Sequence, residues 1–542
     1  MKRFSLVILV MLVTALPVLA QTPKPSLASL IETGNRKAAL DRIRAGADVN
    51  EAQADSTRPI HWAVYRVDYE LLGALIARKA NLNVRNEFGS TPIAQAAELA
   101  DARMVKMLLD AGAEPEGANP DGQTALMLAI RTGEMATVEM LIKAGANVNT
   151  VERFHKQTPL MWAAAAQRNA GEMVKLLLAK GADFNPRAQY TDWPSQITSE
   201  PRAQYRPGGG LTALLYAARD GCYDCVEALI AAGADVNLPT PEGVTALMLA
   251  LDNDHNDVAR LLLDRGANPR VWDVWGRTAL YIAVDRKECA RGTGGNCGQS
   301  RQDDARSPVS SMDIINALLA ADVEINAQLS IHRPSRGGNS GRFIDPLMGT
   351  GCTPLLRATL GTPLSNPPLP IPPVGGDAEV VRVLLAKGAN PNINAMGVTP
   401  FLVAAGVNAG HIGGTGLASQ YSFGSPVNME LMELLLQHGA DVNAQVTGTR
   451  TYSMRISRAP SANEGRTALH IAAQEGKVDL VRYLLSKGAN TAIIDAGGLK
   501  PIDLVGKGAA PASAPAAGAP ASVNPANLAE IRTLLENAAS RK

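Results

Sequence analysis

The stretch "DGQTALMLAIRTGEMATVEMLIKAGANVN", residues 121–149, decides the fold that we predict for this chain. Thr124 is suited to cap a short helix whose Ala- and Leu-rich face allows close packing. Gly133 ends that helix, and a second helix begins in "ATVEMLI" (136–142), where apolar residues recur at helical spacing. Gly145 supplies the left-handed residue that ends the second helix. The stretch therefore predicts two short helices, followed by an extended finger that starts at "ANVN".

The residue that ends this unit recurs along the chain in a register that can be counted. Gly112 and Gly145 lie 33 residues apart, and the longer intervals are this unit plus inserted residues. Asp322 is a tolerable residue for positive φ, whereas Lys79 is not an obvious one and is the weak position in the register. The positions are Gly46, Lys79, Gly112, Gly145, Gly181, Gly233, Gly266, Asp322, Gly388, Gly439 and Gly488.

Two further units carry a resemblance to a known family. They are "QTPLMWAAAAQRNAGEMVKLLLAKGADFN" (157–185) and "GRTALHIAAQEGKVDLVRYLLSKGAN" (465–490). Their shared pattern, T-P/A-L-H-x-A-A, a Gly break, a leucine run and G-A-D/N-x-N, resembles the ankyrin repeat family, and the chain looks like an exported, bacterial member. The resemblance implies an all-α repeat solenoid of stacked helix-turn-helix units with β-hairpin-like fingers, about eleven to twelve units in one continuous core.

The chain is predicted to divide into a leader, a repeat array and a tail. Residues 1–20 are a predicted signal peptide, 21–26 a short linker and 27–505 the repeat solenoid. Residues 506–526 are an Ala/Pro-rich low-complexity insertion, and 527–542 a predicted C-terminal capping helix. Long insertions rich in Gly, Pro, Ser and Asn are expected as loops at 186–209, 287–310, 327–350, 360–377, 406–427 and 444–463.

The N-terminal residues are typical of a secretory signal. Lys2 and Arg3 precede an apolar stretch from Phe4 to Leu16, and Ala20 ends a small-residue cleavage site. The alternative, an uncleaved membrane anchor, is disfavoured because the apolar stretch is short for a span and a Pro-rich polar segment follows it. We expect an exported protein, periplasmic or extracellular, with no stable membrane span after cleavage.

Composition argues against several classes of function. Lys plus Arg is 52 and Asp plus Glu is 51, so the chain is nearly neutral and no nucleic-acid partner is expected. No two of the 7 histidines have metal-ligand spacing on one predicted helix, so no metal site is expected. No motif brings together the residue types and the arrangement that an active site needs. The sequence predicts a monomeric protein that is not an enzyme and has no cofactor.

Cys222 and Cys225 lie three residues apart at the predicted start of a second helix. Their spacing permits a structural disulfide, two buried thiols or a redox-active pair, and the sequence alone leaves all three open. Cys289 and Cys297 share one insertion and could form a second disulfide, which leaves Cys352 as the odd cysteine.

Aromatic residues make up only 4% of the chain, so their positions are informative. By the family resemblance, Trp62, Trp162 and Tyr216 face or border a concave groove. Phe88, Phe154, Trp272 and Trp275 fall at predicted finger tips. Exposed aromatic side chains offer large contact area at small entropic cost, so these seven residues are candidate anchors for a partner, with packing against neighbouring repeats as the alternative.

Three functions are compatible with these features. The leading hypothesis is a non-catalytic scaffold that binds a protein or peptide through the concave face, the finger tips and the inserted loops. The first alternative is a thiol-disulfide oxidoreductase that uses Cys222 and Cys225. The second is a polysaccharide-binding protein that uses the exposed aromatic residues.

Overall fold

The structure, a computed structural model, describes residues 25–119, 121–191, 208–290, 307–330, 351–361, 375–395, 397–407, 427–447, 463–507 and 524–541. The expected signal peptide, Cys297 and most residues of the expected insertions lie outside the described residues. The chain divides into two compact units, Met1–Arg153 and Phe154–Lys542, each described by itself below.

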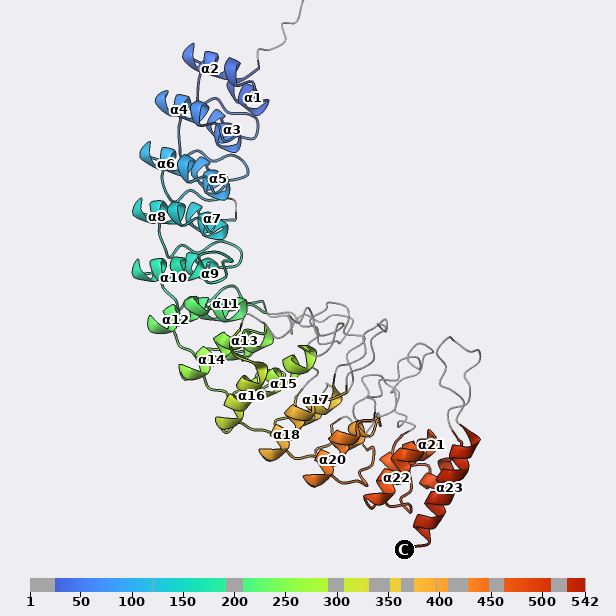
Figure 1. Cartoon of the computed structure of the whole chain (residues 1–542). Helices are drawn as coiled ribbons and strands as arrows, with labels where there is room; N and C mark the ends of the chain where they lie inside the picture. The colour runs from blue at the N-terminus through green and yellow to red at the C-terminus, as the bar shows by residue number, and fades with distance from the viewer. Residues whose placement is uncertain are drawn as a thin grey trace, which may run out of the picture. The chain divides into compact units, whose positions relative to one another are not determined.

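The first unit contains helix pairs in which an inner helix is followed by an outer one. The inner helices lie in one row and the outer helices in a second (Figure 1). The inner helices are α1 (Leu27–Glu32), α3 (Pro59–Tyr65), α5 (Pro92–Glu98) and α7 (Ala125–Thr132). The outer helices are α2 (Arg36–Arg44), α4 (Tyr69–Ala77), α6 (Ala102–Asp110) and α8 (Met135–Lys143).

The second unit repeats this arrangement, and α23 lies at its end beside α22 (Figure 1). Its inner helices are α9 (Pro159–Ala164), α11 (Ala213–Asp220), α13 (Ala246–Asp252), α15 (Ala279–Ala290), α17 (Pro354–Leu360), α19 (Pro400–Ala404) and α21 (Ala468–Gln474). Its outer helices are α10 (Ala170–Ala179), α12 (Tyr223–Ala231), α14 (Asn256–Asp264), α16 (Ser311–Ala320), α18 (Ala378–Ala386), α20 (Met429–Gln437) and α22 (Val478–Ser486). The 3₁₀ helix η4 (Pro501–Leu504) and α23 (Pro525–Ala539) complete it.

Threonine side chains begin the inner helices, as the repeat pattern predicts. Thr124 Oγ1 accepts the N–H of Met127 at 3.3 Å in the first unit, and Thr245 does the same for Met248 in the second. Such a cap satisfies a backbone donor that the helix itself leaves unpaired. Equivalent caps are made by Thr91, Thr158, Thr212, Thr278, Thr353, Thr399 and Thr467.

The counted register is confirmed at its weak position. Lys79 has φ of 60° and Asp322 has φ of 52°, so both occupy the left-handed conformation that glycine adopts elsewhere. At Gly145, with φ of 96°, an added Cβ would meet nothing within 4 Å. Backbone conformation, not space, therefore selects glycine there, and Lys79 is tolerated at a cost in strain.

Asparagine side chains connect successive fingers. In the first unit Asn50 Oδ1 accepts the N–H of Asn81 at 2.8 Å, and Asn83 Oδ1 accepts that of Glu114 at 2.9 Å. In the second unit Asn326 Oδ1 accepts the N–H of Asn390 at 2.8 Å, although 64 residues separate them. The last Asn of these units thus binds the next unit, and the long insertion between Asn326 and Asn390 does not interrupt this contact.

One expected boundary is wrong. The loop predicted from residue 287 begins later, because α15 continues to Ala290. Arg286 and Lys287 form ion pairs with Asp254 and Asp377, so these charged residues extend the helix. Within the insertion predicted at 186–209, the described ends extend a finger, since Tyr190 forms a β-bridge with Gly209.

The predicted capping helix is present as α23, which begins at Pro525. Ile531 and Leu535 bury their side chains against the end of the array, and α23 packs on α22 and η4. Arg532 donates to the carbonyl of Val505 at 3.0 Å. The helix therefore covers the apolar face of the last helix pair, as a capping element does.

Candidate functional site

The finger tips are tight turns built on one acceptor side chain. Asn86 Oδ1 accepts the N–H of Ser90 at 2.9 Å, and its carbonyl accepts that of Gly89 at 2.8 Å. Glu87 donates its N–H to the carbonyl of Asp55 in the preceding finger. Phe88 is held within this turn and is 62% exposed, so the predicted exposure of this side chain is confirmed.

The finger that ends in α15 carries a larger apolar tip. Asp273 Oδ1 accepts the N–H groups of Trp275 at 3.0 Å and of Arg277 at 2.9 Å. Asp273 is buried beneath the turn, whereas its two neighbours in the chain are exposed. Trp272 is 69% exposed and Val274 is 54% exposed. The turn therefore presents two apolar side chains together.

A buried ion pair supports this tip from beneath. Arg277 Nε lies 2.6 Å from Asp273 Oδ2, and Arg277 Nη1 lies 2.9 Å from Asp252 Oδ2 on α13. The guanidinium Cζ also lies 5.2 Å from the centroid of the half-buried Trp275 ring. Because Arg277 holds the turn in place through two carboxylates, the turn loses little further conformational entropy when a partner binds its outer face.

Two more fingers expose apolar side chains in the second unit. Phe154 is 56% exposed, as predicted. Ile494 is exposed beside Asp495, whose Oδ1 accepts the N–H groups of Gly497 and Leu499 at 2.9 Å each. Val274 and Ile494 were not predicted from the sequence, although each adjoins the aspartate that organises its turn.

The three residues predicted for the groove differ in exposure. Tyr216 is buried, and its hydroxyl accepts a 2.7 Å hydrogen bond from Gln157, so its prediction as an exposed anchor is wrong. Trp162 is half-buried. Trp62 is half-buried, and its Nε1–H donates to Gln53 Oε1 at 2.6 Å. Exposed Tyr65, which the sequence did not single out, packs edge-on against Trp62 with ring centroids 5.7 Å apart.

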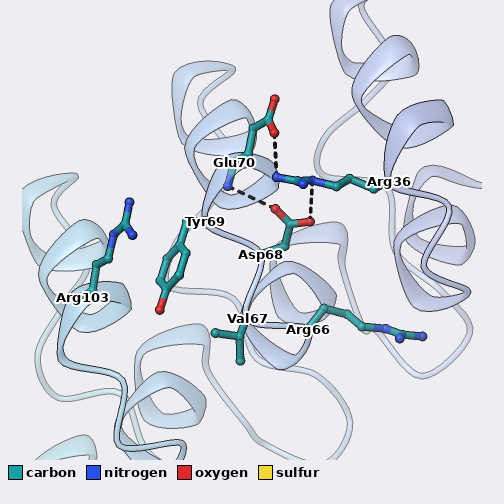
Figure 2. Close-up of a pocket in the computed structure, with 7 residues that line it drawn as sticks. All are labelled: Arg36, Arg66, Val67, Asp68, Tyr69, Glu70 and Arg103. Atoms are coloured by element: carbon teal, nitrogen blue, oxygen red, sulfur yellow. Dashed lines mark hydrogen bonds and ion pairs between the residues drawn. The ribbon is translucent and has the colours of Figure 1, made fainter.

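A polar hollow of about 460 Å³ lies at the inter-helix turns of the first unit. Arg36 reaches between Asp68 and Glu70, at 3.0 Å and 2.6 Å, as Figure 2 shows. Arg103 lies over the ring of Tyr69 with its Cζ 4.1 Å from the centroid. The hydrogen bond from Tyr69 to Asp101 raises the pKa of the phenol. Arg36 is therefore already paired with two carboxylates within the hollow.

Charged side chains are buried among the inner helices from α13 to α17 of the second unit. Arg357 is fully buried, with Nε 2.6 Å from Asp285 Oδ1 and Nη1 2.7 Å from the carbonyl of Gly361. Burial by itself lowers the pKa of Arg357, but the carboxylates of Asp285 and Glu288 outweigh this and raise it. The guanidinium thus stays charged, and the cluster is a structural ion-pair network.

Cys222 and Cys225 are joined in a disulfide at the start of α12. The interpretation of this pair as two separate buried thiols is therefore wrong. Cys352 is free and buried. The predicted pairing of Cys289 with Cys297 lies outside the described residues.

Two kinds of feature are absent from the part of the chain that the structure describes. No group of three or more His, Cys, Asp and Glu side chains is placed to hold a metal ion there. Over the same residues no helix has the length and apolar character needed to span a membrane.

Comparison with protein families gives two matches. The model of ankyrin repeats in three copies matches residues 60–152, 95–188, 195–272 and 214–292, and that of a single ankyrin repeat matches 464–496. The matches therefore fall on segments of both units.

Two curated proteins and one solved structure are similar to parts of the chain. Cyclin-dependent kinase 4 inhibitor B of Rattus norvegicus is 32% identical over 130 residues, which are 24% of this chain and 73% of the inhibitor. Alpha-latrocrustotoxin-Lt1a of Latrodectus tredecimguttatus is 30% identical over 133 residues, 24% of this chain but only 7% of the toxin. The crystal structure of the human ASB11 ankyrin repeat domain, 24% identical, aligns over 45% of this chain and 100% of that domain with a TM-score of 0.36.

Proposed function

Because the chain belongs to the ankyrin repeat family, a protein-binding architecture, we propose that it is a non-catalytic scaffold that binds a protein or peptide partner. The finger tips make the primary contact in this proposal. One observation carries it: in a chain with 4% aromatic residues, Trp272 stands 69% exposed on a turn that buried ion pairs hold in place.

The apolar tips of both units support this choice of surface. Phe88 in the first unit and Trp272 with Val274 in the second lie on fingers, whereas Tyr216 on an inner helix is buried. An aromatic side chain on a rigid turn gives a partner large apolar area without the cost of ordering a loop. The half-buried Trp62 of the first unit and Trp162 of the second would each add contact area within its own unit.

We further propose that the protein acts in the cell envelope or the secreted space. The apolar N-terminal sequence before Gln21 supports export. The Cys222–Cys225 disulfide is consistent with it, since such bonds persist in oxidising compartments.

Site-specific photo-crosslinking tests the binding surface. A benzophenone amino acid at Trp272 is expected to give crosslinked products of fixed mass in native extract, which added unlabelled wild-type protein competes away. A second probe at Phe88 tests the first unit in the same way.

Matched controls carry the same probe at exposed positions away from the fingers. These are Leu99 at the inter-helix turn after α5 and Met429 at the start of α20. Equal crosslinking from Met429 and Trp272, or none from any position, would contradict the proposal.

A further inference from the structure

The first turn of α12 is capped by sulfur. At the equivalent position of other outer helices a carboxylate caps the helix: Asp68 Oδ1 accepts the N–H of Leu71 at 3.0 Å, and Asp101 Oδ1 accepts that of Met104 at 2.9 Å. In α12 the Sγ of Cys222 accepts the N–H of Cys225 at 3.3 Å. A redox-active atom therefore replaces the usual oxygen at this helix end.

The two cysteines of this disulfide differ in their exposure to solvent. Cys225 is fully buried beside Val226 and Leu229 in the core of the unit. Cys222 keeps part of its surface in solvent, and the next two residues, Tyr223 and Asp224, are exposed. An external thiolate can consequently approach Cys222 and cannot approach Cys225.

The helix end favours negative charge on the accessible sulfur. α12 runs for 9 residues from Tyr223 to Ala231, and Cys222 is its N-cap. The partial positive charge at a helix N-terminus lowers the pKa of a thiol placed there, and a thiolate accepts the Cys225 N–H better than a thiol does. The neighbouring carboxylate of Asp224 acts in the opposite direction and reduces this effect.

The first turn is also held in place without the disulfide. Gly171 on α10 lies so close to this turn that an added Cβ would be 2.7 Å from the Cβ of Asp224. Val226 and Leu229 are fully buried. Because packing fixes the turn, opening the S–S bond leaves the two sulfurs near each other, as a reversible exchange requires.

We propose that Cys222–Cys225 is a thiol–disulfide exchange site, attacked at Cys222 by one thiolate of a dithiol. The new S–S bond forms at the Sγ of Cys222, and the electron pair of the broken bond goes to the Sγ of Cys225, which takes a proton. The second thiol of the dithiol then attacks the mixed disulfide and releases Cys222 as a thiolate. The dithiol is oxidised by two electrons and the protein is reduced by two.

The substrate class is an accessible dithiol or disulfide, either a small molecule or a paired cysteine in a protein. The site lies on an inter-helix turn and shares no residue with the finger tips. Its activity is accordingly separable from the proposed partner binding, and failure of either proposal leaves the other intact.

The test uses the full chain with reduced and oxidised dithiothreitol in defined ratios, acid quenching, alkylation and peptide-level mass spectrometry. In the native protein Cys222 and Cys225 should become alkylated together, at ratios where the buried Cys352 stays constant in labelling. A disulfide that opens only after denaturant is added would overturn the proposal, because it would then be purely structural.

Single variants test the asymmetry that the structure shows. In Cys225→Ser the remaining Cys222 should form a mixed disulfide with glutathione disulfide at least about tenfold faster than Cys225 does in Cys222→Ser. Cys352 is the internal reference for global unfolding in each sample. Equal rates, or a faster Cys225, would refute attack at Cys222.

The double variant Cys222→Ser/Cys225→Ser controls for folding. Its thermal unfolding and its crosslinking from Trp272 should match those of the wild type, since packing holds the first turn of α12. If the double variant fails to fold, the native-state alkylation of the wild-type chain still decides between an exchangeable and a locked disulfide.

Discussion

The inter-helix turns of the first unit and the α13–α17 region of the second use the same charged residue types in opposite environments. Arg36 pairs with Asp68 and Glu70 while its side chain stays 52% exposed. Arg357 pairs with Asp285 while its side chain is 0% exposed. A pair in water contributes little because solvent screens it, whereas a buried arginine is indispensable once its carboxylate is also buried.

The difference traces to the composition of the inner helices. α7 reads "ALMLAIRT", and apolar contacts alone bury it. α15 reads "ALYIAVDRKECA", and its Asp285 and Glu288 are buried in the same layer. Carboxylates in an inner helix require cations there, and Arg357 is supplied by the next inner helix along the array.

The largest expected effect is that of Arg357→Met. The variant leaves Asp285 and Glu288 buried without the guanidinium, so we expect a loss of about 3–5 kcal/mol in local stability. Hydrogen exchange of α15 and α17 measures it, because a repeat array need not unfold in one step. Asp285→Asn should lower the local stability by less than Arg357→Met does, because the carboxylate of Glu288 remains near Arg357.

Arg36→Met is the matched control in the first unit. Its side chain is 52% exposed, so we expect a change within about 1 kcal/mol. Equal losses for Arg36→Met and Arg357→Met would show that burial is not what separates the two regions.

Glycine-to-alanine substitutions compare the two units at a smaller scale. Gly221→Ala would place a Cβ 2.4 Å from His255 Nδ1 in addition to the strain of φ at 75°, for a loss of roughly 2–4 kcal/mol. Gly145→Ala meets no atom within 4 Å and should lose only about 1–2 kcal/mol from backbone strain. Thermal and urea unfolding measure both, and a larger loss at Gly145 would be inconsistent with the packing around Gly221.

A pH effect should be common to both units. Burial lowers the pKa of His61 and of His470 below the ordinary 6.5. Each Nδ1 accepts a backbone N–H at 3.1 Å, from Arg58 and Thr467 respectively, and each Nε2 faces a carbonyl, so the native ring is neutral. The unfolded chain then binds more protons, and stability is complete above pH 6.5 and falls as pH drops below it.

The expected slope is at most about 1.4 kcal/mol per pH unit for each histidine. Urea unfolding between pH 7.5 and pH 5 measures it. His61→Gln and His470→Gln should each flatten the curve in this interval, and an unchanged slope in both variants would rule out the neutral buried imidazole.

The smallest expected effect is a gain. Lys79→Gly removes the strain of φ at 60° but makes the unfolded chain more flexible, for a net stabilisation of about 0.5–1 kcal/mol in the first unit. Asp322→Gly should stabilise the second unit by less, because aspartate tolerates the left-handed conformation better than lysine does. Calorimetry compares the two variants, and a loss for Lys79→Gly would mean that its side chain makes a contact worth more than the strain.

The repeat architecture could be predicted from sequence because its signals are local. Thr124 as a cap and Gly145 as a terminator act within a few residues, so one unit determines the register of the others. Lys79 could be placed by counting alone, and the structure confirms it. The true start of the loop after α15 could not be predicted, because the ion pair of Lys287 with Asp377 joins residues 90 positions apart.

The candidate site was predictable only in part. Phe88 and Trp272 were found since few aromatic residues exist and each lies at a fixed place in its unit. The burial of Tyr216 depends on Gln157, a contact that a repeat pattern does not specify. The turn acceptors Asn86, Asp273 and Asp495 share the spacing to a later glycine, and that spacing would have pointed to Val274 and Ile494.

Hydrogen–deuterium exchange, with and without the partner that is crosslinked from Trp272, tests whether the finger tips bind this partner. Binding through the finger tips should slow exchange at residues 268–278 of the second unit, with little change in the outer helix α14. Protection confined to the outer helices, with the fingers exchanging as in the free protein, would contradict it.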